Sequence, residues 1–261
     1  MRLNKFNTLT FDVVGTLIDF ETGILNWFQP HLEQKGSEVE EEEILTLFAR
    51  TEAHYLKTLP KSSFTGLLPV IYSDMMRSWG FSANEEDGLE FQDSIQEWPP
   101  FPDTIDALTE LKKNYHLVAV SNCDSSYLEW MSSSIGDPFD EMVSSDVVGV
   151  NKPDERLFQE VLRRLNRRGI LQEEILHVAQ SQFHDIVPVY VLGWSSVWIH
   201  RRHNRPGFGA TPKPYKMVKP SLNMQNLKEL LEVLKRNRED ESKRSKGTFS
   251  LRVTFNHTEA A

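Results

Sequence analysis

The sequence contains a single cysteine, Cys123, in 261 residues. One cysteine cannot form a disulfide within the chain, which excludes a disulfide-stapled secreted scaffold and favours a reducing compartment. Long apolar runs are lacking as well. No stretch approaches the eighteen or so residues of a membrane-spanning helix, and the opening "MRLNKFNTLTF" has no signal-peptide core. We therefore expect a soluble, cytoplasmic protein without a membrane partner.

Positive charge is also in short supply. The chain has 29 lysines and arginines against 38 aspartates and glutamates, a formal charge of −9. Such a balance repels phosphate backbones, so we expect no nucleic-acid partner. Hydrophobic residues make up 39% of the chain, which at this length predicts one substantial core with a smaller satellite domain.

Short apolar runs rich in β-branched residues recur along the chain and predict strands. They lie at 8–14, 116–122, 141–148, 175–180 and 195–200. Between them, helical spacing of apolar residues occurs at 103–115, 155–169 and 187–193. Alternation of strands and helices is typical of a parallel sheet, so the predicted fold class is α/β.

One long interval departs from this alternation. Residues 20–97 contain amphipathic helical patterns without a convincing strand, and "EWPPFP" (97–102) ends them because proline cannot continue a helix. The sequence thus predicts a core domain, formed by 1–19 and 98–235, with a helical cap inserted after the first strand. The mixed-charge segment 236–261 predicts a disordered tail. Its last residues, "TFSLRVTFNHTEAA", alternate apolar and polar positions and are also compatible with a weak strand.

Polar side chains follow several of the predicted strands. Asp12 ends the first, Ser121 and Asn122 end the second, Lys152 follows the third, and the stretch from Gln180 to Asp185 follows the fourth. Ligands of open parallel sheets bind beyond the carboxyl ends of the strands. We expect these groups to meet in one crevice.

These segments resemble a known family. "FDVVGTLID", "AVSNCD", "VNKPDERLF" and "HVAQSQFHD" are similar to the four motifs of the haloacid dehalogenase (HAD) superfamily, over about residues 7–200. The likeness is greatest to the type II 2-haloacid dehalogenase branch, in particular to fungal-looking members with "WPPFPDT" and "GFGAT". The resemblance implies a Rossmann-like HAD core, a helical cap over the active site, and Asp12 as the nucleophile.

The residue types fit that role. A carboxylate such as Asp12 can attack carbon or phosphorus and form an ester, which divides one difficult displacement into two steps. A nearby cation keeps a partly buried carboxylate ionised, and Lys152 is the candidate. We expect Asp185 to hold Lys152 or a loop in place.

Substrate-binding candidates surround the nucleophile. Ser121 and Asn122, with backbone N–H groups after Asp12, can hold an anionic group, and Thr16 can bond the loop or the nucleophile. Cys123 is interpreted as a packed residue because no histidine partner is identifiable.

Two positions argue against a phosphatase. Phosphatases of the superfamily carry an aspartate two residues after the nucleophile, where this chain has Val14. They also bind Mg²⁺ through an acidic residue of the fourth motif, where this chain has Gln180. Phosphatase activity is therefore the weaker hypothesis, and we expect neither Mg²⁺ nor another cofactor.

A dehalogenase needs neither group, because a halide leaves without a proton. The leading hypothesis is a 2-haloacid dehalogenase that acts on a small organic acid, in which Asp12 forms an ester that water hydrolyses. An arginine on the cap assists the halide in that family, and Arg50 lies in the corresponding region. A homodimer is compatible with the resemblance, and the sequence does not decide it.

A second hypothesis comes from positions at which this chain departs from the dehalogenase pattern. Val14 stands where close relatives usually have a tyrosine, bacterial members have a tyrosine near Phe158, and Asn151 replaces a residue that is commonly aromatic. The cleft could then suit a bulkier, apolar substrate, lined by Val13, Val14, Phe158, Phe183 and Trp27 or Tyr55. The alternative is a HAD scaffold recruited as a cyclase or pericyclase, for example of Diels-Alder type, in secondary metabolism, with Lys152 or Asn122 polarising a carbonyl. A non-catalytic binding protein is the third reading.

Overall fold

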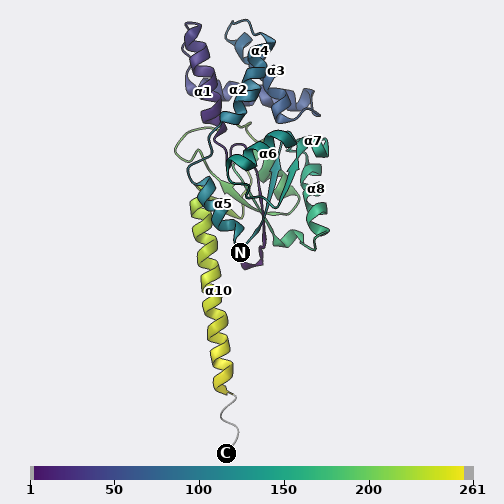
Figure 1. Ribbon diagram of the computed structural model, residues 1–261, viewed down its shortest axis with the longest axis vertical. Helices are drawn as coiled ribbons and strands as arrows, with labels where there is room; N and C mark the ends of the chain where they lie inside the picture. The colour runs from purple at the N-terminus through teal and green to yellow at the C-terminus, as the bar shows by residue number, and fades with distance from the viewer. Residues whose placement is uncertain (1–2, 256–261) are drawn as a thin grey trace, which may run out of the picture.

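The centre of the molecule is a parallel sheet of six strands, in the order β3-β2-β1-β4-β5-β6 (Figure 1). The computed structural model describes residues 3–255. The strands are β1 (Thr8–Phe11), β2 (His116–Ser121), β3 (Glu141–Ser144), β4 (Ile175–Ala179), β5 (Ser195–Ile199) and β6 (Leu222–Met224). β1 lies centrally, between β2 and β4, so its carboxyl end opens at the middle of the sheet.

Both faces of the sheet are covered, as its apolar strands require. Leu117 and Ala119 of β2 belong to one buried cluster, and Val118 and Val120 belong to another, because successive strand residues point to opposite faces. The helices of the sheet domain that contribute to the first cluster are α5 (Thr104–Lys112), α6 (Ser125–Ser134) and α10 (Leu227–Phe255), and residues of the segment between β1 and α5 extend that cluster. Those that contribute to the second are α8 (Glu155–Asn166) and α9 (Val187–Val191). The α/β fold class and the parallel sheet are confirmed.

The segment between β1 and α5 forms a helical body beyond the carboxyl end of β1, at the top of Figure 1. Its helices are α1 (Phe20–Gln34), α2 (Glu41–Thr58), α3 (Phe64–Ser78), α4 (Glu85–Asp93) and the 3₁₀ turn η2 (Ser94–Glu97). Buried aromatic rings fill its interior, with the centroids of Phe28 and Phe91 5.0 Å apart and those of Phe28 and Tyr72 5.8 Å apart. We call this body the cap.

Two chain crossings join the cap to the sheet domain, and they are bonded to each other. The N–H of Asp19 donates to the Pro99 carbonyl at 2.8 Å, and the N–H of Phe101 donates to the Leu17 carbonyl at 2.9 Å. Pro100 also forms a bridge with Ile18. The crossings therefore fix where the cap stands over the strand ends.

Two strand predictions need correction. The run 141–148 is a strand only as far as Ser144, and α7 (Ser145–Val148) follows as a single helical turn that ends at Gly149. Asp146 explains the break, since its carboxylate accepts bonds from the N–H and hydroxyl of Ser125 at 3.1 and 2.8 Å. The sequence also gave no sign of β6, whose three residues contain no β-branched side chain.

The expected disordered tail is another difference. α10 continues through residue 236 as far as Phe255, so most of the predicted tail, and the first part of the weak strand, are helical. Glutamate, lysine and arginine are good helix formers, so the helix can continue beyond its buried leucines, and pairs such as Arg236 with Glu232, at 3.2 Å, support it. Residues 256–261 of the prediction lie outside the described part of the chain.

Within residues 3–255, each helix is too short or too polar to span a membrane.

Candidate active site

Asp12 stands immediately after β1, where the chain makes a tight turn toward the cap. The N–H of Leu17 donates to the Val13 carbonyl and the N–H of Gly15 donates to the Ile18 carbonyl, both at 2.8 Å. Gly15 has a φ of 89°, a left-handed conformation that glycine adopts without steric strain. The Arg201 guanidinium donates to the Thr16 carbonyl and fixes the turn from the sheet side. Asp12 as a whole is 5% exposed.

Both oxygens of the Asp12 carboxylate have partners. The Lys152 ammonium lies 2.6 Å from Oδ1, and the Thr16 hydroxyl donates to Oδ2 at 2.5 Å. Lys152 also bonds Asp185 Oδ1 at 2.8 Å and the Val120 carbonyl at 3.1 Å. One buried ammonium thus bridges two buried carboxylates, from three different strand ends.

The charges of this cluster shift its pKa values in opposite directions. Burial would lower the pKa of Lys152, but the charges of Asp12 and Asp185 raise it above its usual value. Burial raises the pKa of Asp12, and the Lys152 charge opposes that rise. Burial would likewise raise the pKa of Asp185, but Lys152 and a hydrogen bond from His177 hold it below the usual range. Asp185 is therefore the more firmly ionised carboxylate.

Asp185 belongs to η4 (Gln182–Ile186), a turn of π-helix, and a second contact from the sheet holds it there. His177 Nε2 lies 3.1 Å from Asp185 Oδ1, and His177 Nδ1 lies 2.9 Å from the Thr10 hydroxyl. His177 and Asp185 are fully buried. His177 on β4 and Thr10 on β1 therefore fix the orientation of Asp185, the partner of Lys152.

The two polar residues that end β2 have different tasks. Asn122 uses both ends of its amide on the Lys152 backbone: Oδ1 accepts from Lys152 N at 2.7 Å, and Nδ2 donates to Lys152 O at 3.1 Å. Ser121 Oγ accepts from Cys123 N at 3.1 Å, which leaves its own hydroxyl proton able to donate. Asn122 therefore positions Lys152, while Ser121 can bind a ligand.

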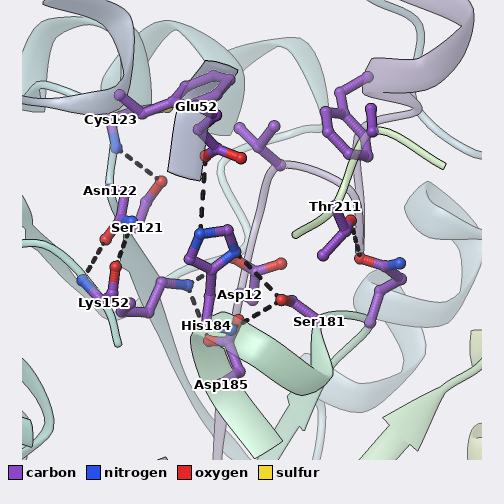
Figure 2. A pocket seen from close by; sticks show the side chains of 15 residues that line it. Asp12, Glu52, Ser121, Asn122, Cys123, Lys152, Ser181, His184, Asp185 and Thr211 are labelled. Carbon is purple, nitrogen blue, oxygen red and sulfur yellow. Dashed lines mark hydrogen bonds and ion pairs between the residues drawn. The ribbon is translucent and has the colours of Figure 1, made fainter. Parts of the chain in front are cut away.

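These groups face a small cavity between the sheet domain and the cap, of about 40 Å³ (Figure 2). Its lining includes seven of the predicted site residues: Asp12, Val14, Ser121, Asn122, Lys152, Gln180 and Asp185. Thr16, an eighth predicted site residue, lies behind this lining: its hydroxyl donates to Asp12 and accepts from Gln180 N at 2.8 Å. The remaining lining residues are Phe20, Glu52, Phe64, Cys123, Ser181, His184, Ala210 and Thr211.

The structure places Arg50, a predicted substrate-binding residue, outside this cavity. Arg50 is exposed on α2 beside grooves that Leu47 and Asp74 also border. Residues two apart on a helix lie about 200° apart around its axis, so the face of α2 that carries Glu52 toward the cavity turns Arg50 away.

Phe158 is the second correction. It is fully buried in the core under α8, where its ring meets the rings of His177 and Trp194 edge-on, with centroids 5.3 and 6.0 Å apart. Phe158 lies behind the cavity and supports His177. Of the predicted apolar cleft, Val14 lines the cavity, whereas Val13 is core, Trp27 packs inside the cap, Phe183 packs on His184, and Tyr55 donates to Asp74 at 2.6 Å.

Glu52 and His184 are the charged or titratable residues of the cavity that sequence reasoning missed. Glu52 Oε1 lies 3.6 Å from His184 Nε2, and Figure 2 shows the two side chains facing each other across the cavity. A signal for Glu52 was available, because it continues the buried stripe of Ile44 and Phe48 at steps of four residues. His184 stands directly before Asp185 in the motif "HVAQSQFHD".

Cys123 is buried in the lining, as a packed residue. Burial raises the pKa of its thiol to about 12, which leaves it in the unreactive protonated form.

The donor set does not fit a divalent cation. The Lys152 ammonium occupies one oxygen of each of the two carboxylates, Asp12 and Asp185, and the neutral Gln180 amide stands beside them. Among the described residues, no group of three or more histidine, cysteine, aspartate or glutamate side chains is arranged to hold a metal. Divalent cations prefer sets of free oxygens.

A parallel α/β domain with a buried aspartate at its central strand end and a cap above it defines a capped hydrolase. The sequence matches the haloacid dehalogenase-like hydrolase family over residues 6–179, more than half of the chain. The protein belongs to that family.

Individual relatives are more distant. The (S)-2-haloacid dehalogenase 4A of Burkholderia cepacia is 23% identical over 217 residues, which cover 80% of this chain and 90% of that enzyme. The glyceraldehyde 3-phosphate phosphatase of Methanothermobacter thermautotrophicus is 35% identical over 105 residues. That match covers 39% of this chain and spans less than half of that phosphatase, 45%.

The fold is also that of solved dehalogenase structures. The structure of L-2-haloacid dehalogenase from Xanthobacter autotrophicus superposes with a TM-score of 0.71 at 17% identity, covering 88% of this chain and 98% of that one. At this identity the likeness establishes the shared fold.

Proposed function

We propose that this hydrolase is a 2-haloacid dehalogenase in which Asp12 attacks the carbon that bears the halogen. The observation that supports the proposal most directly is the state of the Asp12 carboxylate. It faces the cavity, Lys152 and Thr16 hold its two oxygens, and Val14 stands where a phosphatase needs an acid. A site with a held nucleophile and no aspartate two residues after it, where a phosphatase carries its acid, suits a leaving group that needs no proton.

In the first step, an oxygen of Asp12 bonds to the substrate carbon and the carbon–halogen bond breaks, so the halide leaves with the bonding electrons. Lys152 keeps Asp12 ionised despite its burial, and Thr16 orients it. The Ser121 hydroxyl can donate to the carboxylate of a small organic acid. In the second step, water attacks the ester carbon of Asp12 and releases the hydroxy acid.

The size of the cavity favours a short substrate. The cavity is small, whereas a cyclase or pericyclase of secondary metabolism must enclose a carbon skeleton. The geometry thus favours the halo acid over the cyclase, which stays a prediction. We propose further that the reaction uses no metal, because the Lys152 ammonium takes the place between the carboxylates that a cation would need.

Halide release tests the proposal. Purified protein is given 2-chloropropionate or 2-bromopropionate, and halide is measured with time. We expect turnover by the wild type, unchanged turnover by Asp106→Ala, an exposed aspartate on α5, and a loss of several orders of magnitude in Asp12→Ala.

A second substrate tests the phosphatase hypothesis against the dehalogenase proposal. Brisk hydrolysis of p-nitrophenyl phosphate with Mg²⁺, in the absence of halide release, would overturn the proposal. Equal halide release by wild type and Asp12→Ala would do the same, because the reaction would then not pass through Asp12.

A further inference from the structure

The cap gives the cavity one carboxylic acid. Of the lining residues that come from the cap, Phe20 and Phe64 are aromatic and Glu52 is polar. The Glu52 side chain is 5% exposed, and it stands on α2 opposite the strand ends that carry Asp12 and Lys152. A buried carboxyl group on an otherwise apolar surface is unfavourable unless it has a partner.

The side of the cavity that faces Glu52, formed by η4, has polar atoms without hydrogen bonds in the described part of the chain. His184 Nε2 and Asp185 Oδ2 are buried and, within the described part of the chain, unbonded. His184 Nδ1 lies 3.1 Å from the Ser181 hydroxyl, whose oxygen also accepts from His184 N at 2.8 Å. With the Nδ1 proton directed to Ser181, the Nε2 lone pair faces Glu52.

The spacing of these atoms suits one water molecule. The 3.6 Å between Glu52 Oε1 and His184 Nε2 is too long for a good direct hydrogen bond. A water to one side of the line between them can bond both. A water needs about 10–15 Å³ and two to four polar partners, and the cavity has about 40 Å³.

We propose that Glu52 and His184 hold the water that hydrolyses the Asp12 ester, with His184 as its base and Glu52 as the acid for the departing alcohol. The inference rests on the proposed function and deepens it. Val14 cannot supply acid–base chemistry. In this proposal that chemistry comes from Glu52 of the cap and His184 of η4.

The protons balance as follows. The water oxygen bonds to Cγ of the Asp12 ester while His184 Nε2 takes one of the water protons. The Cγ–O bond to the alcohol breaks, and the Glu52 proton passes to the alcohol oxygen. His184 then returns its proton to Glu52 across their contact, and the regenerated Asp12 acid loses the remaining proton to solvent.

The environment prepares each partner for its role. Burial and the Asp12 charge raise the pKa of Glu52 to about 8, so it carries a proton at neutral pH. Burial lowers the pKa of His184 to about 4, so its ring is neutral there. The other titratable groups that line the cavity are Asp12, Cys123, Lys152 and Asp185. Two groups with pKa values moved apart are the arrangement that acid–base pairs use.

Pre-steady-state kinetics separate the two steps. Glu52→Gln and His184→Gln are mixed with 2-bromopropionate, and halide and the mass of the intact protein are followed. We expect about one halide per active site at the wild-type rate, then turnover slowed about 10²–10⁴-fold, with the Asp12 ester visible as added mass. Glu41→Gln, an exposed glutamate on the same helix, should behave as the wild type.

The pH profile is a second readout, which a merely structural role would not move. Wild-type turnover should decline as pH rises past 8, when Glu52 loses its proton, and Glu52→Gln should lack that decline. Unchanged turnover in both variants, or slowing of the halide burst and turnover together, would overturn the pair as the site of the second step. Absence of any halide from the wild type would instead defeat the proposed function itself, and the inference with it.

Discussion

The two walls of the cavity differ in how completely their polar groups are bonded. On the sheet side, Lys152 lies between the carboxylates of Asp12 and Asp185 and bonds both, although Asp185 Oδ2 has no hydrogen bond among the described residues. On the cap side, Glu52 faces His184 of η4 at 3.6 Å, and the buried Nε2 of that histidine is also unbonded there. The nucleophile is therefore held on both of its oxygens, whereas the Glu52–His184 pair is left open.

The difference reflects what each wall has to do. A nucleophile must be held in one place and kept ionised, which requires partners that remain throughout the reaction. Groups that move protons must exchange partners, so permanent hydrogen bonds would impair them. Unsatisfied buried atoms carry a free-energy penalty, and the site accepts that penalty at His184 Nε2, where proton transfer needs a free partner.

Breaking the sheet side should have the largest effect. Lys152→Met leaves two buried carboxylates without their cation, and we expect it to lower the free energy of unfolding by about 3–5 kcal/mol and to abolish turnover. Urea denaturation at pH 7 measures the loss. Lys112→Met is the matched control, since it removes an exposed pair with Asp140 and should cost less than about 1 kcal/mol. Equal losses would show that the buried bridge contributes no more than a surface pair.

The ionisation of Asp12 should appear in the pH dependence of kcat/KM. Attack requires the carboxylate, and burial raises the pKa of Asp12 above the ordinary value of 3.8. Activity should therefore fall about tenfold per pH unit as pH drops through a midpoint above that value. A midpoint below 3.8, from initial rates of halide release over a pH series, would contradict the raised pKa.

The cap side should show a smaller effect, on stability. Glu52 has a pKa of about 8 in the folded protein and an ordinary value of 4.5, so between these values the folded state binds more protons than the unfolded state. Stability from this residue is therefore lost as pH rises from 4.5 to 8.

Glu52→Gln removes that loss because the amide does not ionise. Its melting temperature should exceed that of the wild type at pH 8 and approach it at pH 5, as measured by differential scanning fluorimetry. A variant that is less stable than the wild type at pH 8 would indicate that Glu52 is ionised and paired in the folded state.

The smallest effect is expected at Arg50. Because Arg50 points away from both walls, Arg50→Ala should change the free energy of unfolding by no more than about 0.5 kcal/mol and leave halide release unchanged. A large loss of activity with normal folding would place Arg50 in the site after all.

Much of the sheet domain followed from local pattern. The apolar runs that became β1, β2, β4 and β5 were predicted because strands buried on both faces are continuous hydrophobic segments. β6 and α7 were not predicted, because a strand of three residues without β-branching and a single helical turn carry little signal in the sequence. Asp146, which bonds Ser125 from twenty-one residues away, ended β3 through a tertiary contact.

The sequence by itself determined the α/β class, the helical insertion after β1, and the polar residues at the strand ends, because the succession of strands and helices along the chain, and the residues that follow each strand, are local features. Only the tertiary structure decided which cap residue enters the cavity. That choice depends on the rotation of α2 over the sheet, which brings in Glu52, turns Arg50 outward and sets Glu52 opposite His184, 132 residues further along the chain.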